Sequence, residues 1–269
     1  MDNGVLRVAD ICAALEERAP AAYAESYDNV GLLVGEPDSP ATKALVALDV
    51  TEETVAYAVR RGCNLIVSHH PIWFGAKKRL TGEDPAARCI MAALRAKVAI
   101  CAAHTNLDNV FDGVNAKICD RLGLEQRRIL APAKGNENVG SGMIGTLPAP
   151  MSVPDFLDLV QKTFQTPVLR HNDRTPEKIW RVAVCGGAGS FLLPAAQDAG
   201  ADALITADVS YHKFFDASLL LVDVGHYESE QFTPEILLNA IKNKFPNFEM
   251  ELAPFSTNPV RYYIARQSF

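Results

Sequence analysis

The sequence contains no apolar run of the roughly 20 residues that cross a lipid bilayer, and its first residues lack the basic and then apolar pattern of a secretory signal. Basic residues are not in excess, since 26 Lys and Arg stand against 32 Asp and Glu and the formal net charge is −6. The six cysteines show no C-x-x-C spacing and stand mostly in apolar runs, which is typical of reduced, buried thiols. We therefore expect a cytoplasmic protein without membrane contacts, and the acidic balance disfavours nucleic acid as a partner.

Apolar segments of strand length alternate with segments of helical periodicity along most of the chain. Residues 52–61, for example, follow Thr51, a favourable helix cap, and precede the apolar run 65–67. This alternation predicts an α/β fold with a largely parallel sheet. Helices are expected at 8–18, 52–61, 85–97, 113–122, from 152, 191–199 and 234–244, and strands at 43–50, 65–67, 98–101, 143–147, 180–185, 203–206, 219–224, 248–252 and 260–265.

The second half of the chain resembles the first. A shift of 138 residues places Gly62 on Gly200 and Val46 on Val184, which indicates a diverged internal duplication. Residues 131–142 have the Gly, Asn and Pro composition of a loop and indicate a domain boundary. We predict two related α/β domains. Their expected ranges are 1–130 for the first domain, 131–221 for the second, and 222–269 for a C-terminal segment.

Two blocks of the sequence place a histidine four residues before a carboxylate. His104 precedes Asp108 in this way, and His226 precedes Glu230; each block follows an apolar run. Ligands of open α/β sheets gather beyond the carboxyl ends of the strands. Imidazole and carboxylate together bind divalent ions such as Zn, Mn or Fe, and on a helical turn residues i and i+4 share a face. The two blocks therefore predict a metal site at strand C-terminal ends.

His69 and His70 follow a third apolar run. Adjacent side chains in extended backbone point to opposite faces, and Pro71 favours extended geometry at His70, so we expect the two rings to serve different ions. Paired ions about 3.5–4 Å apart can share a bound hydroxide, and bridging carboxylates suit such a pair. The sequence thus predicts two divalent metal ions per subunit. The proposed ligands are His69, His70, Asp108, His226 and Glu230.

The remaining histidines have other expected roles. His104 is either a direct metal ligand or an outer residue that orients a ligand or carries a proton. Asp208 and His212 repeat the four-residue spacing in reverse order, and either line the pocket or serve as a helix cap and a surface residue. His171 stands in a polar stretch and is expected to be a loop residue. Because histidine titrates near neutrality, His104 and His212 are the candidate catalytic proton carriers.

Two further segments have alternative interpretations. The segment from Gly186 to Ser190 lies between a strand and a helix and could cradle phosphate, but it lacks a complete nucleotide-binding pattern, so a tight turn is the simpler interpretation. The basic segment from Lys77 to Arg79 is either an anion-binding element or a solvated loop.

Five motifs along almost the whole chain give it a specific resemblance to the dinuclear-metal hexameric proteins known as GTP cyclohydrolase type 2 homologues, a Nif-like family of ring proteins. The motifs occur in the order of the family and are Tyr27 to Gly35, Ser68 to Phe74, His104 to Asp108, Thr206 to His212, and Gly225 to Glu230.

The resemblance implies two α/β domains, with residues 222–269 returning to the first domain. It also implies a homohexameric ring with di-metal centres that face an inner cavity. Carried onto this sequence, the five proposed ligands match those of the family, with Glu230 as the bridge. Ala207 replaces a glycine that is common in the family, which leaves the role of its loop open.

Two classes of function remain open from the sequence. The first is a metal-dependent hydrolase in which two ions activate water, acting on GTP as the family label suggests or on another nucleotide or phosphoester. The second is a non-catalytic metal-binding ring scaffold or regulatory partner. A catalytic site keeps a coordination position for water, whereas a structural site fills its positions with protein ligands.

Overall fold

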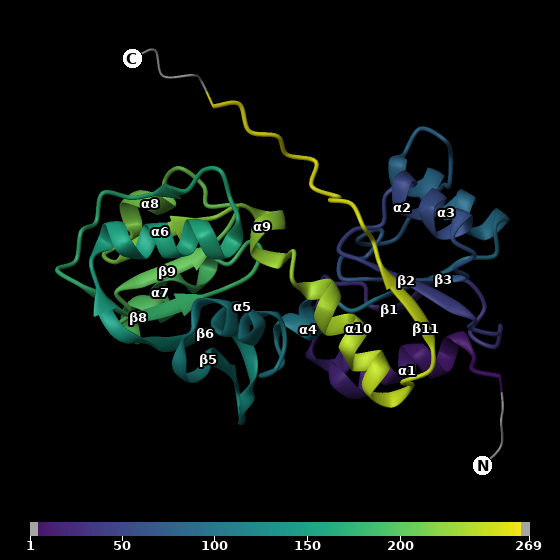
Figure 1. The fold of residues 1–269 in the computed structure, drawn as a ribbon, viewed down its shortest axis with the longest axis horizontal. Helices are drawn as coiled ribbons and strands as arrows, with labels where there is room; N and C mark the ends of the chain where they lie inside the picture. The colour runs from purple at the N-terminus through teal and green to yellow at the C-terminus, as the bar shows by residue number, and fades with distance from the viewer. Residues whose placement is uncertain (1–4, 265–269) are drawn as a thin grey trace. The chain divides into compact units, whose positions relative to one another are not determined.

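The computed structural model describes residues 5–264 and divides the chain into two compact units. Unit 1 comprises residues 1–114 and 232–256, and unit 2 comprises residues 115–231 and 257–269. Each unit contains one β-sheet with helices packed on it (Figure 1), which confirms the α/β class. The chain passes from one unit to the other at 114/115, 231/232 and 256/257; the sequence suggested boundaries at 130/131 and 221/222. Within the described residues, no helix is both long and apolar enough to cross a membrane.

Unit 1 is a five-stranded sheet with helices on both faces. Its strand order is β1-β4-β3-β2-β11, in which only the edge strand β1 is antiparallel to its neighbour. Figure 1 shows α2 and α3 on one side of this sheet and α1 and α10 on the other. The elements are α1 (Val8–Arg18), η1 (Ala21–Tyr23), β1 (Gly31–Val34), β2 (Lys43–Ala47), α2 (Glu52–Arg60), β3 (Leu65–Ser68), α3 (Pro85–Arg95), β4 (Ala99–Ala102), α4 (Thr105–Asp108), α10 (Thr233–Lys244) and β11 (Glu249–Leu252).

Unit 2 is built on a six-stranded mixed sheet with the order β5-β6-β8-β9-β10-β7. Strands β8, β9 and β10 are parallel, and the other pairs are antiparallel. The elements are α5 (Val114–Leu122), β5 (Glu125–Ala133), β6 (Asn136–Met151), α6 (Val153–Phe164), β7 (Arg170–His171), β8 (Ile179–Val184), η2 (Ser190–Leu192), α7 (Leu193–Asp198), β9 (Ala203–Thr206), α8 (Lys213–Asp216), β10 (Leu220–Asp223) and α9 (His226–Glu230).

The apolar runs become the central strands of both sheets. Every residue of β3, β4, β9 and β10 is buried, because parallel strands covered on both faces need apolar side chains on both. The caps read from the sequence also form. The Oγ1 of Thr51 accepts a hydrogen bond from the Thr54 amide at the start of α2, and the Oγ of Ser152 accepts one from the Asp155 amide at the start of α6.

The register of the strands agrees with the proposed duplication. Val46 on β2 pairs with Val67 on β3. At the shift of 138 residues, Val184 on β8 pairs with Ile205 on β9. Each pair of strands is parallel and is connected through one helix, α2 in unit 1 and α7 in unit 2. The two units therefore share the same β-α-β element in the same register.

Two expected elements differ from the structure. Residues 131–142, expected to be a loop, form the turn between β5 and β6 together with the end of β5 and the start of β6. Gly140 sits in this pairing, and a Cβ at its position would lie 2.2 Å from the Ala131 carbonyl oxygen. The absence of a side chain at Gly140 thus permits the close approach of β5 and β6. The strand expected at 260–265 does not form at 260–264, and residue 265 lies outside the described range.

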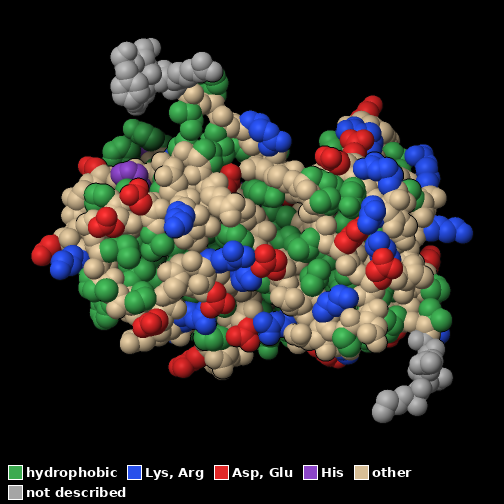
Figure 2. Space-filling model, viewed as in Figure 1, with side chains coloured by type: hydrophobic (Ala, Val, Ile, Leu, Met, Phe, Trp, Pro, Cys, Tyr) green, Lys and Arg blue, Asp and Glu red, His purple; other side chains and the backbone are tan. Residues whose placement is uncertain are grey.

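Charged side chains of both signs are interspersed on the face drawn in Figure 2. No broad field of Lys and Arg covers the described residues on that face, as the balanced composition of the sequence suggested.

Candidate metal centre

Three imidazole rings converge in unit 1. His69, His70 and His104 each offer one ring nitrogen, and these nitrogens all lie within 4.8 Å of one another. The His69 and His70 rings are 5.0 Å apart and the His69 and His104 rings 5.1 Å apart. The first two rings do not point in opposite directions as expected, because β3 ends at Ser68 and the strict alternation of a strand ends with it. Three nitrogens at this spacing fit one divalent cation.

The orientation of His69 is fixed by the backbone of the neighbouring strand. This side chain is fully buried, and its Nδ1 lies 2.9 Å from the carbonyl oxygen of Ala103, one residue past β4. A carbonyl oxygen can only accept a hydrogen bond, so Nδ1 carries the hydrogen and Nε2 carries the lone pair. Nε2 lies 3.6 Å from Oδ1 of Asp108, at the end of α4. The tautomer and the nearby carboxylate both suit metal binding at Nε2.

His70 is oriented in the same way by a carboxylate. Its Nδ1 donates to Oδ1 of Asp49 over 2.6 Å. Asp49 follows the carboxyl end of β2, directly beside the end of β3 that carries His70. A carboxylate on the outer ring nitrogen fixes the tautomer and raises the basicity of the other nitrogen, as it does for many metal-bound histidines.

The third imidazole, His104, is held by the buried carboxylate of Asp28. Its Nδ1 lies 2.9 Å from Oδ1 of Asp28, and the other oxygen of Asp28 accepts hydrogen bonds from the amide and hydroxyl of Thr105. Burial by itself raises the pKa of Asp28, but the hydrogen bonds from His104 and Thr105 and the attraction of the imidazole outweigh burial and lower this pKa to about 2. Asp28 is therefore a carboxylate at neutral pH, able to hold the Nδ1 hydrogen of His104.

Unit 2 carries a second group of metal-type donors. Glu230 is buried at 3% side-chain exposure, and its Oε2 lies 3.2 Å from Nε2 of His226 on the same helix, α9. The other ring nitrogen of His226, Nδ1, lies 2.7 Å from Oδ2 of Asp208. Asp208 has the left-handed backbone angle φ +53°, which is rare for a residue with a Cβ and clusters at functional sites. The i,i+4 contact expected from the sequence is present.

The glycine segment 186–189 supports Glu230 and does not form a phosphate cradle. The Gly187 amide donates to the Ser229 hydroxyl, and the Gly189 amide donates to the Thr206 hydroxyl. A Cβ on Gly187 would lie 2.5 Å from Oε1 of Glu230. These amides are thus engaged within the protein, and the segment is a tight turn packed against the carboxylate.

The other histidines and the basic segment lie elsewhere. His212 is exposed at the start of α8 with its ring 5.4 Å from that of Tyr211, and it joins none of the groups of metal-type donors found among residues 5–264. His171 is exposed, and its Nδ1 contacts the carbonyl oxygen of Asn172, but it lies on β7 and not in a loop as the sequence suggested. In the basic segment, Lys77 pairs with Asp84, which caps α3.

Sequence reasoning did not identify the residues that orient the imidazoles. Asp28 and Asp49 were not predicted, and Asp208 was expected either to line the pocket or to cap a helix. For Asp49 a signal exists, because it follows the strand 43–47 as the histidines follow theirs. The four imidazoles share one feature, an oxygen acceptor on Nδ1, and Nε2 of both His69 and His226 lies near a carboxylate. In unit 1 the three converging imidazoles form a group that could hold a metal ion.

Comparisons with known proteins place these motifs in a family. The family model described as Duf34/NIF3 (NGG1p interacting factor 3) matches residues 6–259. A Clostridium acetobutylicum protein named GTP cyclohydrolase 1 type 2 homolog is 33% identical over 229 residues, 84% of this chain and 85% of the relative. A Lactococcus lactis protein of the same name is 32% identical over 264 residues, 94% of this chain and 98% of the relative. The crystal structure of Staphylococcus aureus hypothetical protein SA1388 has a TM-score of 0.88 and 27% identity, and the match covers 97% of this chain and 100% of that one.

Proposed function

Because this chain belongs to the Duf34/NIF3 (NGG1p interacting factor 3) family, we propose that it is a hydrolase that depends on divalent metal ions. The observation that carries the proposal is the arrangement of the imidazoles. Each of His69, His70, His104 and His226 has Nδ1 on an oxygen acceptor. Exposed His171 also has Nδ1 on an oxygen acceptor, but it joins no group of metal-type donors among residues 5–264, whereas the ring nitrogens of His69, His70 and His104 converge. A converging imidazole that is oriented in this way gains basicity as a metal ligand.

The proposal assigns two divalent ions, Zn, Mn or Fe, to each subunit. Bound ions of this kind supply a Lewis acid and lower the pKa of coordinated water towards neutrality. The residues that would hold them are His69, His70, Asp108, His226 and Glu230, with Glu230 as the bridge. That these donors from the two units act on the same pair of ions is part of the proposal.

The residues around the donors have their own tasks in this proposal. Asp49 and Asp208 hold His70 and His226 in the tautomer that presents Nε2. His104 is either a further ligand or the group that carries a proton to or from the substrate, with its ring oriented by Asp28. His212 is the second candidate proton carrier, from the exposed start of α8 in unit 2.

The substrate class follows from the names of the relatives. They are named as homologues of a GTP cyclohydrolase, so GTP, with opening of the guanine imidazole ring and loss of formate, is one proposed reaction. Another nucleotide or phosphoester is the alternative. We also propose that six copies form a closed ring, which light scattering would show as a mass six times that of the 29.2-kDa chain.

Turnover by protein of defined metal content tests the proposal. Purified chain would be loaded with Zn, Mn or Fe, its metal content measured by elemental analysis, and its activity assayed on a panel of nucleotides and phosphoesters. We expect hydrolysis of at least one compound by the natural sequence and none by His70→Ala. His171→Ala is the matched control, since His171 is exposed on β7, and it should retain full activity.

A non-catalytic metal scaffold is the rival function. It predicts that the natural chain and His70→Ala are equally inert across the whole panel while the natural chain keeps its bound metal. Loss of metal from the natural chain under every loading condition would contradict both functions.

A further inference from the structure

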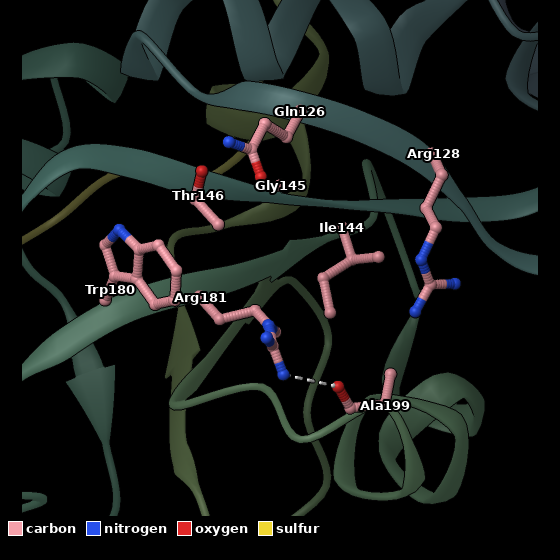
Figure 3. A pocket seen from close by; sticks show the side chains of 8 residues that line it. All are labelled: Gln126, Arg128, Ile144, Gly145, Thr146, Trp180, Arg181 and Ala199. Atoms are coloured by element: carbon pink, nitrogen blue, oxygen red, sulfur yellow. Dashed lines mark hydrogen bonds between the residues drawn. The ribbon is translucent and has the colours of Figure 1, made fainter.

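Unit 2 contains a surface pocket that plays no part in the metal chemistry. It has a cavity volume of about 270 Å³ and lies where β5, β6 and β8 meet the end of α7. Figure 3 shows the indole of Trp180 on one side, the guanidinium group of Arg128 on the other, and the side chains of Arg181 and Ile144 between them. From these groups we infer that the pocket binds a small planar molecule carrying an anionic oxygen group, either a phosphate or a carboxylate.

The strand register brings Ile144, Thr146 and Arg181 to one face of the sheet. Thr146 on β6 pairs directly with Arg181 on β8, so both side chains lie on the same face of the sheet. Ile144 lies two residues from Thr146 and therefore shares that face. On the other side of β6, the pairs Glu125 with Thr146 and Arg128 with Ile144 leave one extra residue on β5, which is a β-bulge.

The bulge contains a strained residue that lines the pocket. Gln126 has φ +49°, a left-handed conformation that is costly for a residue with a Cβ. Bulges of this kind redirect side chains next to binding sites. Here Gln126 contributes an amide to the same cavity as Arg128.

The two arginines provide positive charge without a protein counterion. Neither Arg128 nor Arg181 forms an ion pair with any residue between 5 and 264. The Nη1 of Arg181 donates to the carbonyl oxygen of Ala199 over 3.2 Å, which anchors that guanidinium (Figure 3). The Nη1 of Arg128 has only a 3.4 Å contact with the Ile129 carbonyl oxygen. The other guanidinium N–H groups can therefore bind the oxygens of an anion in the planar geometry that arginine favours.

The wall formed by Trp180 suits an aromatic ring. Trp180 is 40% exposed, and the guanidinium carbon of Arg181 lies 5.9 Å from the centre of its ring. Thr146 is 7% exposed and its hydroxyl forms no hydrogen bond with the described part of the chain, so it offers a donor at the wall. The volume is slightly below the usual range of about 300–1,000 Å³ for drug-sized sites. A single ring with one anionic substituent matches this size.

Binding of simple probes to the full-length chain tests the inference. The probes are phenyl phosphate, benzoate, inorganic phosphate and uncharged benzyl alcohol. The chain has two tryptophans, so Trp73→Phe leaves Trp180 as the sole indole, and calorimetry on the natural chain provides a second measurement. We expect saturable binding and quenching by phenyl phosphate or benzoate, and the stronger of the two identifies the preferred oxygen group. Inorganic phosphate and benzyl alcohol should bind at least about tenfold more weakly, because each lacks one half of the recognised structure.

Matched variants locate the site. Arg128→Gln and Arg181→Gln should each weaken phenyl phosphate binding about tenfold or more, since each removes charge-assisted hydrogen bonds. Arg95→Gln, at an exposed position of α3, should leave binding unchanged. Arg128 makes so few contacts that its variant should unfold at the same temperature as the natural chain.

Three results would overturn the inference. The first is no saturable binding of either aromatic anion. The second is equal binding by the arginine variants and the natural chain. The third is a changed sedimentation coefficient of Arg128→Gln or Arg181→Gln in the absence of probe, which would identify the pocket as a contact between copies of the chain.

Discussion

Replacement of Gly187 by alanine tests whether the tight turn 186–189 sets the position of the Glu230 carboxylate. A Cβ at position 187 would lie 2.5 Å from Oε1 of Glu230 and 3.3 Å from Cε1 of His226. The first distance is far below van der Waals contact, so one of the two groups must move. Glu230 presents the end of a side chain, which moves more easily than the turn, and we expect the carboxylate to be displaced from its position beside His226.

The structure allows the effects on stability and on metal affinity to be estimated separately. Gly187 has φ +60°, and a residue with a Cβ pays about 1–2 kcal/mol for this left-handed conformation. The free energy of unfolding should fall by about that amount. If Glu230 is a metal ligand as proposed, displacement of its carboxylate should in addition weaken metal binding about 10–100-fold, the usual effect of disturbing the contacts that support a ligand.

Gly123→Ala is the control, because it introduces the same backbone strain without a steric clash. Gly123 also belongs to unit 2 and has φ +67°, but a Cβ there would meet no atom within 4 Å. Both variants should lose similar stability in urea denaturation of the metal-free protein, and only Gly187→Ala should lose affinity in a competition assay with a chromophoric chelator. Equal metal affinity of the two variants, whether both lose affinity or neither does, would refute the role given to the turn and to Glu230.

Three further predictions follow from contacts of individual residues. Asp49→Ala should weaken metal binding about 10–100-fold because His70 loses its acceptor, whereas Asp49→Asn, which keeps a carbonyl oxygen, should lose less; equal losses would contradict the orienting role. Because the pKa of Asp28 is lowered from 3.8 to about 2, its stabilising effect is complete above pH 3.8 and is lost as the pH falls through the folded-state value. Asp28→Asn should therefore show a shallower fall in unfolding free energy between about pH 5 and pH 2 than the natural chain, and parallel curves would exclude this linkage. Among the thiols, a hydrogen bond from Cys101 lowers the pKa of the half-buried Cys12, whereas burial raises the pKa of Cys119 to about 12. Cys12→Ser should therefore abolish the fastest phase of reaction with a disulfide reagent. A persisting fast phase would show that another thiol reacts first.

The central strands could be predicted from the sequence because their burial leaves a local trace. Strands β3 and β9 are buried on both faces and are apolar except for their last residues, Ser68 and Thr206. The β5–β6 pairing left no such trace. Its segment 131–142 is rich in glycine, which suggested a loop, yet Gly140 is needed because the Ala131 carbonyl oxygen approaches it closely. Composition alone cannot distinguish a glycine that serves flexibility from one that serves close packing.

The metal-type donors can be predicted from the sequence more readily than the groups that orient them. His70 and His104 follow apolar strands, so the rule that ligands gather at strand ends finds them in the sequence. Asp49 follows the end of β2 and could have been found by applying that rule to acids as well as to histidines. Asp28 could not, because it precedes β1 and reaches His104 across 76 residues of sequence. The identity of a donor is thus encoded locally, while the tautomer that makes it a donor depends on a contact that only the folded chain creates.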